Sequence, residues 1–285
     1  MTDPVAHPIH RLSTIARPVD PRYPTNLAIL IIMGLAGAGL SITAIVRGAG
    51  VLDALLAGLL GSLVVFVTWA LTRDLAPDDD PAAFVALVPV GVVVLDGANP
   101  ALLGPLVALG LVRVVNRSVG PAALLVDRVA LTVLVFVLAR EGHGFGVGAA
   151  AVVAFALDAV LPERHPNGWV FAGLAAAATG MGMLIGAPQL GVVPPGPWTF
   201  GAMAIAAVYG LVIITQGAPT SPGDTTPDQP LRRDRVQGGM LVGLLAGAGS
   251  LLGGDEAVQT WGVMWAAFAG VVLTRPLLRW RAGHA

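Results

Sequence analysis

Runs of about twenty apolar residues recur from one end of the chain to the other, and they constrain its fold more than any other feature. A helix of that length spans the roughly 30 Å hydrocarbon core of a bilayer. Of the 285 residues, 55% are hydrophobic and only 12% are charged, which is about half the charged fraction of a soluble domain. The sequence therefore predicts an all-α, polytopic helical membrane bundle.

Ten apolar ranges predict about ten transmembrane helices. The expected spans are 26–46, 52–72, 82–95, 99–115, 121–139, 145–161, 169–187, 198–216, 237–253 and 258–274. The third and fourth are short for a full crossing, and the turn sequence at 96–100 joins them. We expect a tilted pair or a re-entrant hairpin there, and either one returns the chain to the same side of the membrane.

The remaining ranges predict the domain organisation. Residues 1–24 form an N-terminal tail, 25–275 the transmembrane domain and 276–285 a C-terminal tail. Residues 217–236 are polar and rich in proline, a composition that is typical of a flexible linker. Residues 187–198 are uncharged and rich in proline, and we expect them to lie on the outer membrane surface.

The distribution of arginine predicts the orientation. All sixteen basic residues are arginines, and thirteen of them fall on one side when both termini are cytoplasmic. Only Arg47 and Arg140 then fall outside, while Arg128 lies within a span. The positive-inside rule therefore predicts an N-in/C-in protein of the cytoplasmic (inner) membrane of a bacterium. The tryptophans predicted to anchor span ends at the headgroups are Trp69, Trp169, Trp198, Trp261 and Trp280.

Composition also excludes several kinds of site. The chain has no cysteine and no lysine, which removes disulfides, thiolate metal sites and Schiff-base chemistry. A net charge of −1 does not indicate nucleic-acid binding. Membrane lipids are the expected partners. Gly239, Gly243 and Gly247 share one face of the helix at 237–253, and this spacing suits either internal packing or a homo- or hetero-oligomer interface.

Charged residues inside the predicted spans are the first candidates for function. Asp127 and Arg128 are adjacent in the fifth span, about 10 Å deep if the helix begins near Pro121. Neighbours on a helix point about 100° apart, so each needs its own partner, and Asp158 near the end of the sixth span is the natural partner of Arg128. Either a substrate path or a structural salt bridge accounts for them.

Two arginines extend the same hypothesis. Arg113 and Arg117 lie at the inner membrane face, where they are placed to bind a lipid phosphate or a substrate anion. With Asp127, Arg128 and Asp158 they form the predicted path of a secondary transporter or permease-like protein for a small solute or a lipid-linked molecule.

A weak internal repeat gives the second hypothesis. Residues 70–84 and 156–171 each end a span with Ala-Leu, continue through a charged segment with two prolines, and open the next span with an aromatic residue. Asp74 and Asp78 in the first copy, and Asp158 and Glu163 in the second, would hold Mg²⁺ ions that bridge a lipid diphosphate. Solvated, helix-capping carboxylates are the alternative.

The stretch from Arg73 to Asp78, Arg-Asp-Leu-Ala-Pro-Asp, resembles an aspartate motif of UbiA-type prenyltransferases. The resemblance implies an intramembrane enzyme acting on a polyprenyl or lipid diphosphate at the cytoplasmic face. The chain departs from the family pattern because it lacks the opening Asn of the first motif and a clear Asp-x-x-x-Asp in the second loop. A third hypothesis is a non-catalytic subunit of a membrane complex, because few charged side chains fall within the spans.

Overall fold

A computed structural model describes residues 9, 12–95, 100–141, 144–186 and 193–282, with no side-chain description at 226–227 and 276–282. The first half of the chain forms α1 (Pro24–Val46), α2 (Val51–Leu75), α3 (Asp80–Val85), α4 (Leu87–Leu95), α5 (Leu103–Asn116), α6 (Leu125–Ala139) and α7 (Phe145–Val160). The second half forms α8 (Gly168–Gly186), α9 (Pro197–Ile214), β1 (Pro222–Gly223), β2 (Thr226–Pro230), α10 (Arg233–Ala248), η2 (Gly249–Gly253), α11 (Gly254–Thr260) and α12 (Gly262–Ala282).

The described chain is helical apart from one short antiparallel hairpin, β1–β2. Five segments in it are long and apolar enough to cross a membrane, namely α1, α2, α8, α9 and the continuous stretch from α10 to α11. Helices occupy all ten predicted ranges, but several are short. The crossing of the membrane by all ten stays a prediction.

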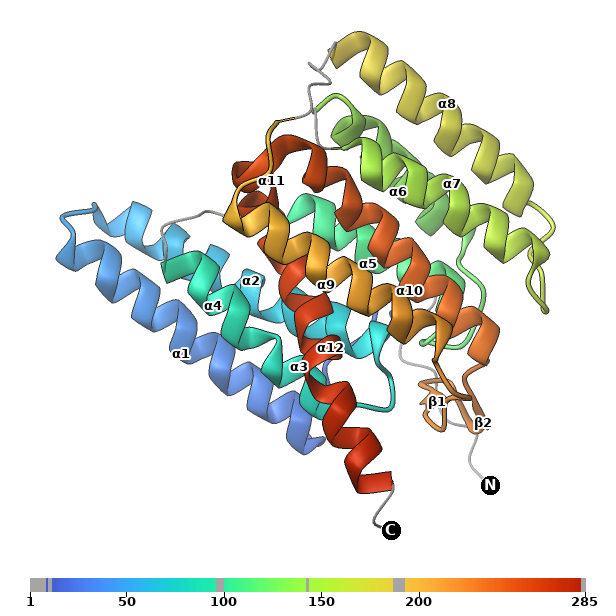
Figure 1. Ribbon diagram of the computed structural model, residues 1–285, viewed down its shortest axis with the longest axis horizontal. Helices are drawn as coiled ribbons and strands as arrows, with labels where there is room; N and C mark the ends of the chain where they lie inside the picture. The colour runs from blue at the N-terminus through green and yellow to red at the C-terminus, as the bar shows by residue number, and fades with distance from the viewer. Residues whose placement is uncertain (1–8, 10–11, 96–99, 142–143, 187–192, 283–285) are drawn as a thin grey trace.

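The helices form a bundle with two exposed edges (Figure 1). The α1–α2 hairpin projects at one edge, and α1 is only 11% buried over its most apolar window because it packs mainly on α2. Their backbones approach closely, since a Cβ at Gly58 would lie 2.6 Å from the carbonyl oxygen of Gly37. At the other edge α8 packs on α6 and α7, and α5, α10 and α12 fill the centre.

Two helix boundaries differ from the predicted ones in ways that matter for the site. α2 continues to Leu75, which places Asp74 in its last turn. α10 begins at Arg233, which places Arg235 inside the helix. Hydropathy alone places a span boundary before charged residues. Here the helices continue through Asp74 and Arg235, because both side chains are buried against other helices.

The polar segment at 217–236 contains the β1–β2 hairpin and the start of α10, and its flexibility stays a prediction. Its hairpin is bound to the loop after α5 by backbone hydrogen bonds from Asp224 to Ser118 (3.0 Å) and from Thr225 to Val119 (3.1 Å). The backbone amides of Thr220 and Ser221 donate to the Asp78 carboxylate at 3.0 and 2.8 Å. Composition alone carries no information about these long-range hydrogen bonds.

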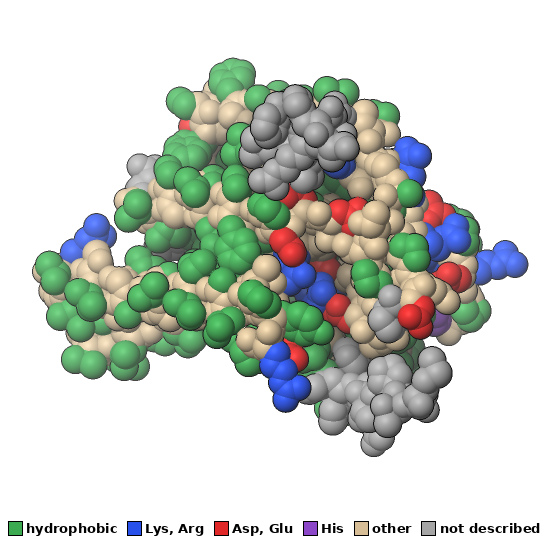
Figure 2. Space-filling view, turned by 90° about the horizontal axis from the view of Figure 1, so that it is seen from below, with side chains coloured by type: hydrophobic (Ala, Val, Ile, Leu, Met, Phe, Trp, Pro, Cys, Tyr) green, Lys and Arg blue, Asp and Glu red, His purple; other side chains and the backbone are tan. Residues whose placement is uncertain are grey.

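The end of the bundle that carries this hairpin and the C-terminal half of α12 is called the charged end below (Figure 1). Viewed from this end, acidic and basic side chains gather between the hydrophobic α1–α2 arm and the rest of the molecule (Figure 2). The predicted turn at 96–99 and the first half of the loop at 187–198 lie outside the described residues.

Candidate functional site

A buried carboxylate with three arginines is the most concentrated charge at the charged end. Asp158, in the last turn of α7, is fully buried. One of its oxygens accepts from Arg117 at 3.0 Å and from Arg235 at 3.3 Å, and the other accepts from Arg128 at 2.5 Å. The predicted pairing of Arg128 with Asp158 is confirmed. We call Arg117, Arg128, Asp158 and Arg235 the arginine cluster.

Backbone carbonyls at helix ends help to balance the charge of the arginine cluster. Arg235 donates to the carbonyl oxygens of Val115 (2.9 Å) and Pro162 (2.7 Å). Val115 is in the last turn of α5, and Pro162 follows the end of α7. Arg128 donates to the carbonyl of Ala123 at 3.1 Å. The carbonyls of Val115 and Pro162 are at the C-terminal ends of α5 and α7, where partial negative charge stabilises cations.

The backbone is strained at Arg117 of the arginine cluster and at its neighbour Glu163. Arg117 (φ 52°) and Glu163 (φ 63°) are the two non-glycine residues with positive φ in the described chain. They contact each other, because Arg117 donates to the Glu163 carbonyl at 2.6 Å and to its carboxylate at 3.3 Å. A left-handed conformation costs a non-glycine residue about 1–2 kcal/mol, so these contacts must offset that cost.

The guanidinium of Arg128 is completely buried and lies beside two aromatic rings that contact each other. Its central carbon is 5.9 Å from the ring centre of Phe155 and 5.8 Å from that of Phe171. One of its amino nitrogens, Nη1, has no hydrogen-bond partner among the described residues. The faces of the two rings therefore supply part of the compensation for this charge.

The second predicted arginine, Arg113, binds a different carboxylate. Its Nε donates to Asp74 at 2.7 Å, and the side-chain amide of Asn116 donates to the Asp74 carbonyl at 2.9 Å. Arg113 and Arg117 are four residues apart at the end of α5. This one short helix therefore binds Asp74 of α2 through one arginine and Asp158 of α7 through the other.

Asp127 caps the N-terminus of α6. The helix begins at Leu125 rather than near Pro121, so Asp127 is in its first turn. Its carboxylate accepts from the backbone amide of Leu124 at 3.1 Å and from the amide and hydroxyl of Thr14 at 3.0 and 3.2 Å. An acidic residue at this position stabilises a helix N-terminus, and here it also holds the N-terminal tail.

The acidic side chains after α2 bind separate partners. Asp78 is exposed and accepts from Thr220 and Ser221, Asp79 is buried and accepts from the hydroxyl of Thr274, and Asp80 pairs with Arg73 at 3.4 Å. Within the part of the chain that is described, no three His, Cys, Asp or Glu side chains are grouped to hold a metal ion. The structure thus does not bring Asp74, Asp78, Asp158 and Glu163 together.

Two titratable groups in the loops of the charged end have shifted pKa values. Burial lowers the pKa of the His165 imidazole from 6.5; Arg128 and Arg117 add to this shift and Asp158 opposes it. Burial raises the pKa of the Asp224 carboxyl, and the guanidinium of Arg17 opposes that shift. His165 is therefore neutral at neutral pH and adds no further cation beside the arginine cluster.

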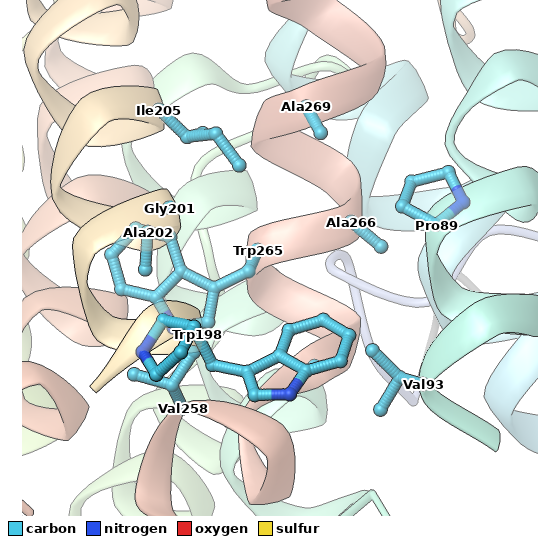
Figure 3. A pocket seen from close by; sticks show the side chains of 12 residues that line it. Pro89, Val93, Trp198, Gly201, Ala202, Ile205, Val258, Trp265, Ala266 and Ala269 are labelled. Carbon is cyan, nitrogen blue, oxygen red and sulfur yellow. The ribbon is translucent and has the colours of Figure 1, made fainter. Parts of the chain in front are cut away.

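An apolar cavity of about 260 Å³ lies among α4, α9, α11 and α12 (Figure 3). Trp198, Gly201 and Ile205 of α9 line one side, and Trp265 and Ala266 of α12 line another. No charged side chain of the described chain lines it. The lining residues of α9 and α12 belong to the first halves of these helices, whereas the later Thr274 of α12 binds Asp79 at the charged end. The cavity is therefore displaced from the charged end.

Comparisons with protein-family models, curated proteins and solved structures found no match to this chain. Its function is therefore inferred from the arrangement of its own residues.

Several residues of these sites were missed by the sequence reasoning. Arg235 completes the arginine cluster. Its position next to the start of the predicted span at 237–253 could have indicated a role, because an arginine there can point into the bundle. Trp69 and Trp261 are only 5% and 4% exposed, so their rings pack inside the bundle rather than on its surface. Trp169 is 62% exposed, as a ring at headgroup level would be. Nothing in the local sequence of Trp198 or Trp265 indicated a cavity, because the cavity forms only where four helices meet.

Proposed function

We propose that the chain is a multi-pass protein of the cytoplasmic membrane that carries a small apolar or amphiphilic molecule, such as a lipid-linked compound. In this proposal the charged end faces the cytoplasm, as the distribution of arginines predicts. The observation that carries the proposal is the partly open apolar cavity of about 260 Å³ among α4, α9, α11 and α12.

The lining of this cavity favours an apolar cargo. Ligand cavities are mostly apolar with a few polar groups that fix orientation, and here Trp198 and Trp265 flank small residues of α9 and α12. Trp265 donates its indole N–H to Ser250 at 2.9 Å and is thereby held in place. An ionic solute would find no compensating charge among the lining residues.

The contacts at the charged end support a carrier that is closed on that side. The arginine cluster links α5, α6, α7 and α10, Arg113 links α5 to α2, and Thr274 links α12 to the Asp79 loop. In alternating access, one side of the binding site is closed while the other is open. The arginine cluster and Asp74 therefore act, in this proposal, as part of a closure rather than as the path itself.

The diphosphate-enzyme hypothesis has less support from the same geometry. It requires carboxylates free to bind Mg²⁺, but both oxygens of Asp158 accept from guanidinium groups. Asp78 is likewise occupied by the amides of Thr220 and Ser221.

The test uses two glycines of the same helix. A Cβ at Gly201 or at Gly210 would meet no atom within 4 Å, but only Gly201 lines the cavity. We expect proteoliposomes with the wild-type chain to exchange a short-chain NBD-labelled phospholipid between leaflets faster than protein-free liposomes. Gly201→Phe fills the cavity and should abolish this exchange, while Gly210→Phe should retain it.

Quenching of the outer-leaflet label by dithionite measures the exchange. Equal activity of the two phenylalanine variants, or an exchange by the wild type no faster than in protein-free liposomes, would contradict the proposed carriage of an amphiphilic cargo through this cavity.

A further inference from the structure

A second, smaller cavity, lined partly by arginine side chains, lies at the charged end, apart from the proposed cargo cavity. Its polar lining comes from Arg17 of the N-terminal tail, Asn26 of α1, Trp69 and Arg73 of α2, and Arg113 of α5. Pro18, Val19, Phe66 and Ala70 complete it. We call it the tail pocket. Its volume is about 20 Å³, which is room for one water-sized oxygen atom.

The charge of the tail pocket is one-sided. Three guanidinium groups line it, and none of the described lining residues is acidic. Their carboxylate partners are outside the lining: Asp224 pairs with Arg17 at 2.6 Å, Asp80 with Arg73 at 3.4 Å, and Asp74 with Arg113 at 2.7 Å. Each of these guanidinium groups therefore already has a carboxylate partner, and an anion that enters the cavity would share the arginines with Asp224, Asp80 and Asp74.

Trp69, one of the residues that line the pocket, has a donor that is unpaired within the described chain. The indole nitrogen Nε1 of Trp69 is buried and has no acceptor among the described residues, although Trp69 is only 5% exposed. A buried N–H without an acceptor is unfavourable, so native proteins rarely retain one without a partner. Arg73 lies over the indole ring, 5.1 Å from its centre, and keeps its charge beside this donor.

The surroundings of the pocket favour a lipid as the source of the acceptor. The pocket lies at the base of the α1–α2 arm, whose outward side chains are apolar (Figure 2). The exposed Tyr23, immediately before α1, is the kind of residue that lies at headgroup level. Basic pockets beside membrane helices on the cytoplasmic side bind the phosphates of anionic lipids.

We propose that the tail pocket binds the phosphate group of an anionic phospholipid from the adjacent leaflet. One phosphate oxygen occupies the cavity and accepts from the Trp69 indole. The guanidinium groups of Arg17 and Arg73 bind the other oxygens at the mouth, and Phe66 and Val19 contact the apolar part of the lipid.

The experiment measures binding of dihexanoyl phosphatidylglycerol to the full-length protein in neutral detergent by native mass spectrometry. The double variant Arg17→Gln/Arg73→Gln should weaken binding at least about tenfold, because each charge-assisted hydrogen bond is worth about this much. Trp69→Phe removes only the N–H donor and should weaken binding by a smaller factor. Arg22→Gln removes the same charge from an exposed site of the tail outside the pocket and should leave binding unchanged.

Three results would overturn the proposal. One is unchanged affinity in both pocket variants, and another is an equal loss in Arg22→Gln. The third comes from competition with inorganic phosphate: displacement of the lipid at comparable affinity would assign the pocket to a soluble phosphate compound. Failure of inorganic phosphate to compete, together with loss of binding in the pocket variants, supports the lipid. The cargo-exchange assay is independent of these results, because Gly201 and the tail pocket are separate sites.

Discussion

At the scale of single residues, this protein buries charge where three cations share one anion. Burying an isolated charge in a helical bundle is unfavourable, and the arrangement persists only when hydrogen bonds and opposite charges compensate it. Asp158 binds Arg117, Arg128 and Arg235, and backbone carbonyls accept from other donors of Arg128 and Arg235. Burial, Arg128 and Arg117 lower the pKa of the nearby His165 imidazole, and Asp158 opposes this shift.

Asp158→Asn tests this account. The substitution preserves shape but removes the counter-charge of three buried or nearly buried guanidinium groups, so we expect it to lower the free energy of unfolding by about 3–5 kcal/mol. Denaturant unfolding in detergent, followed by circular dichroism, provides the measurement. The matched control is Asp80→Asn, whose carboxylate is 51% exposed and pairs with Arg73; it should cost less than about 1 kcal/mol. Comparable losses in the two variants would refute the assignment.

At the scale of elements, two central helices hold the bundle together in different ways. α5 does so through charge, with Arg113 bound to α2 and Arg117 bound to α7. α10 does so through small residues, because its glycines at 239, 243 and 247 lie against α5, α2 and α12 of the same chain. This glycine face is therefore used in internal packing, and association of copies through α10 stays a prediction.

The packing of α10 predicts a specific sensitivity to side-chain size. A Cβ at Gly247 would lie 2.9 Å from the Phe268 ring, so Gly247→Val should lower the free energy of unfolding by about 1–3 kcal/mol through overpacking. Gly180→Val in α8 makes the same chemical change where a Cβ would meet nothing within 4 Å. The thermal unfolding midpoints of both variants decide the matter: a drop confined to Gly247→Val is expected, and equal midpoints would contradict the close packing of α10 on α12.

At the scale of the whole molecule, charge and cavity are separated along the bundle. The ion pairs gather at the end that carries the β1–β2 hairpin, and the apolar cavity lies among the first halves of α9 and α12. This separation matches the distribution of arginines in the sequence, which predicts that the charged end is cytoplasmic. It also places the tail pocket and the cargo cavity on different parts of the molecule.

Cysteine labelling tests that orientation directly, because the natural chain has no cysteine. Arg47→Cys, between α1 and α2, and Asp228→Cys, in β2, both introduce thiols at exposed positions. In intact cells a membrane-impermeant maleimide should label Cys at position 47 and should label position 228 only after the membrane is opened. The reverse pattern would show that the charged end faces outward.

The sequence by itself determined the helices, and it did so through local physics. Each apolar run is long enough to form a helix, and helices occupy all ten predicted ranges in the structure. The charge of Arg128 within one of these ranges required a partner, which is Asp158. Only the tertiary structure decided the roles of Asp127 and Arg235 and the existence of the cavities. Thr14 and Asp127 are 113 positions apart in the chain, and Arg235 and Asp158 are 77 apart. Such contacts depend on how whole helices pack, because burial and partner choice are properties of the assembled bundle and not of any local pattern.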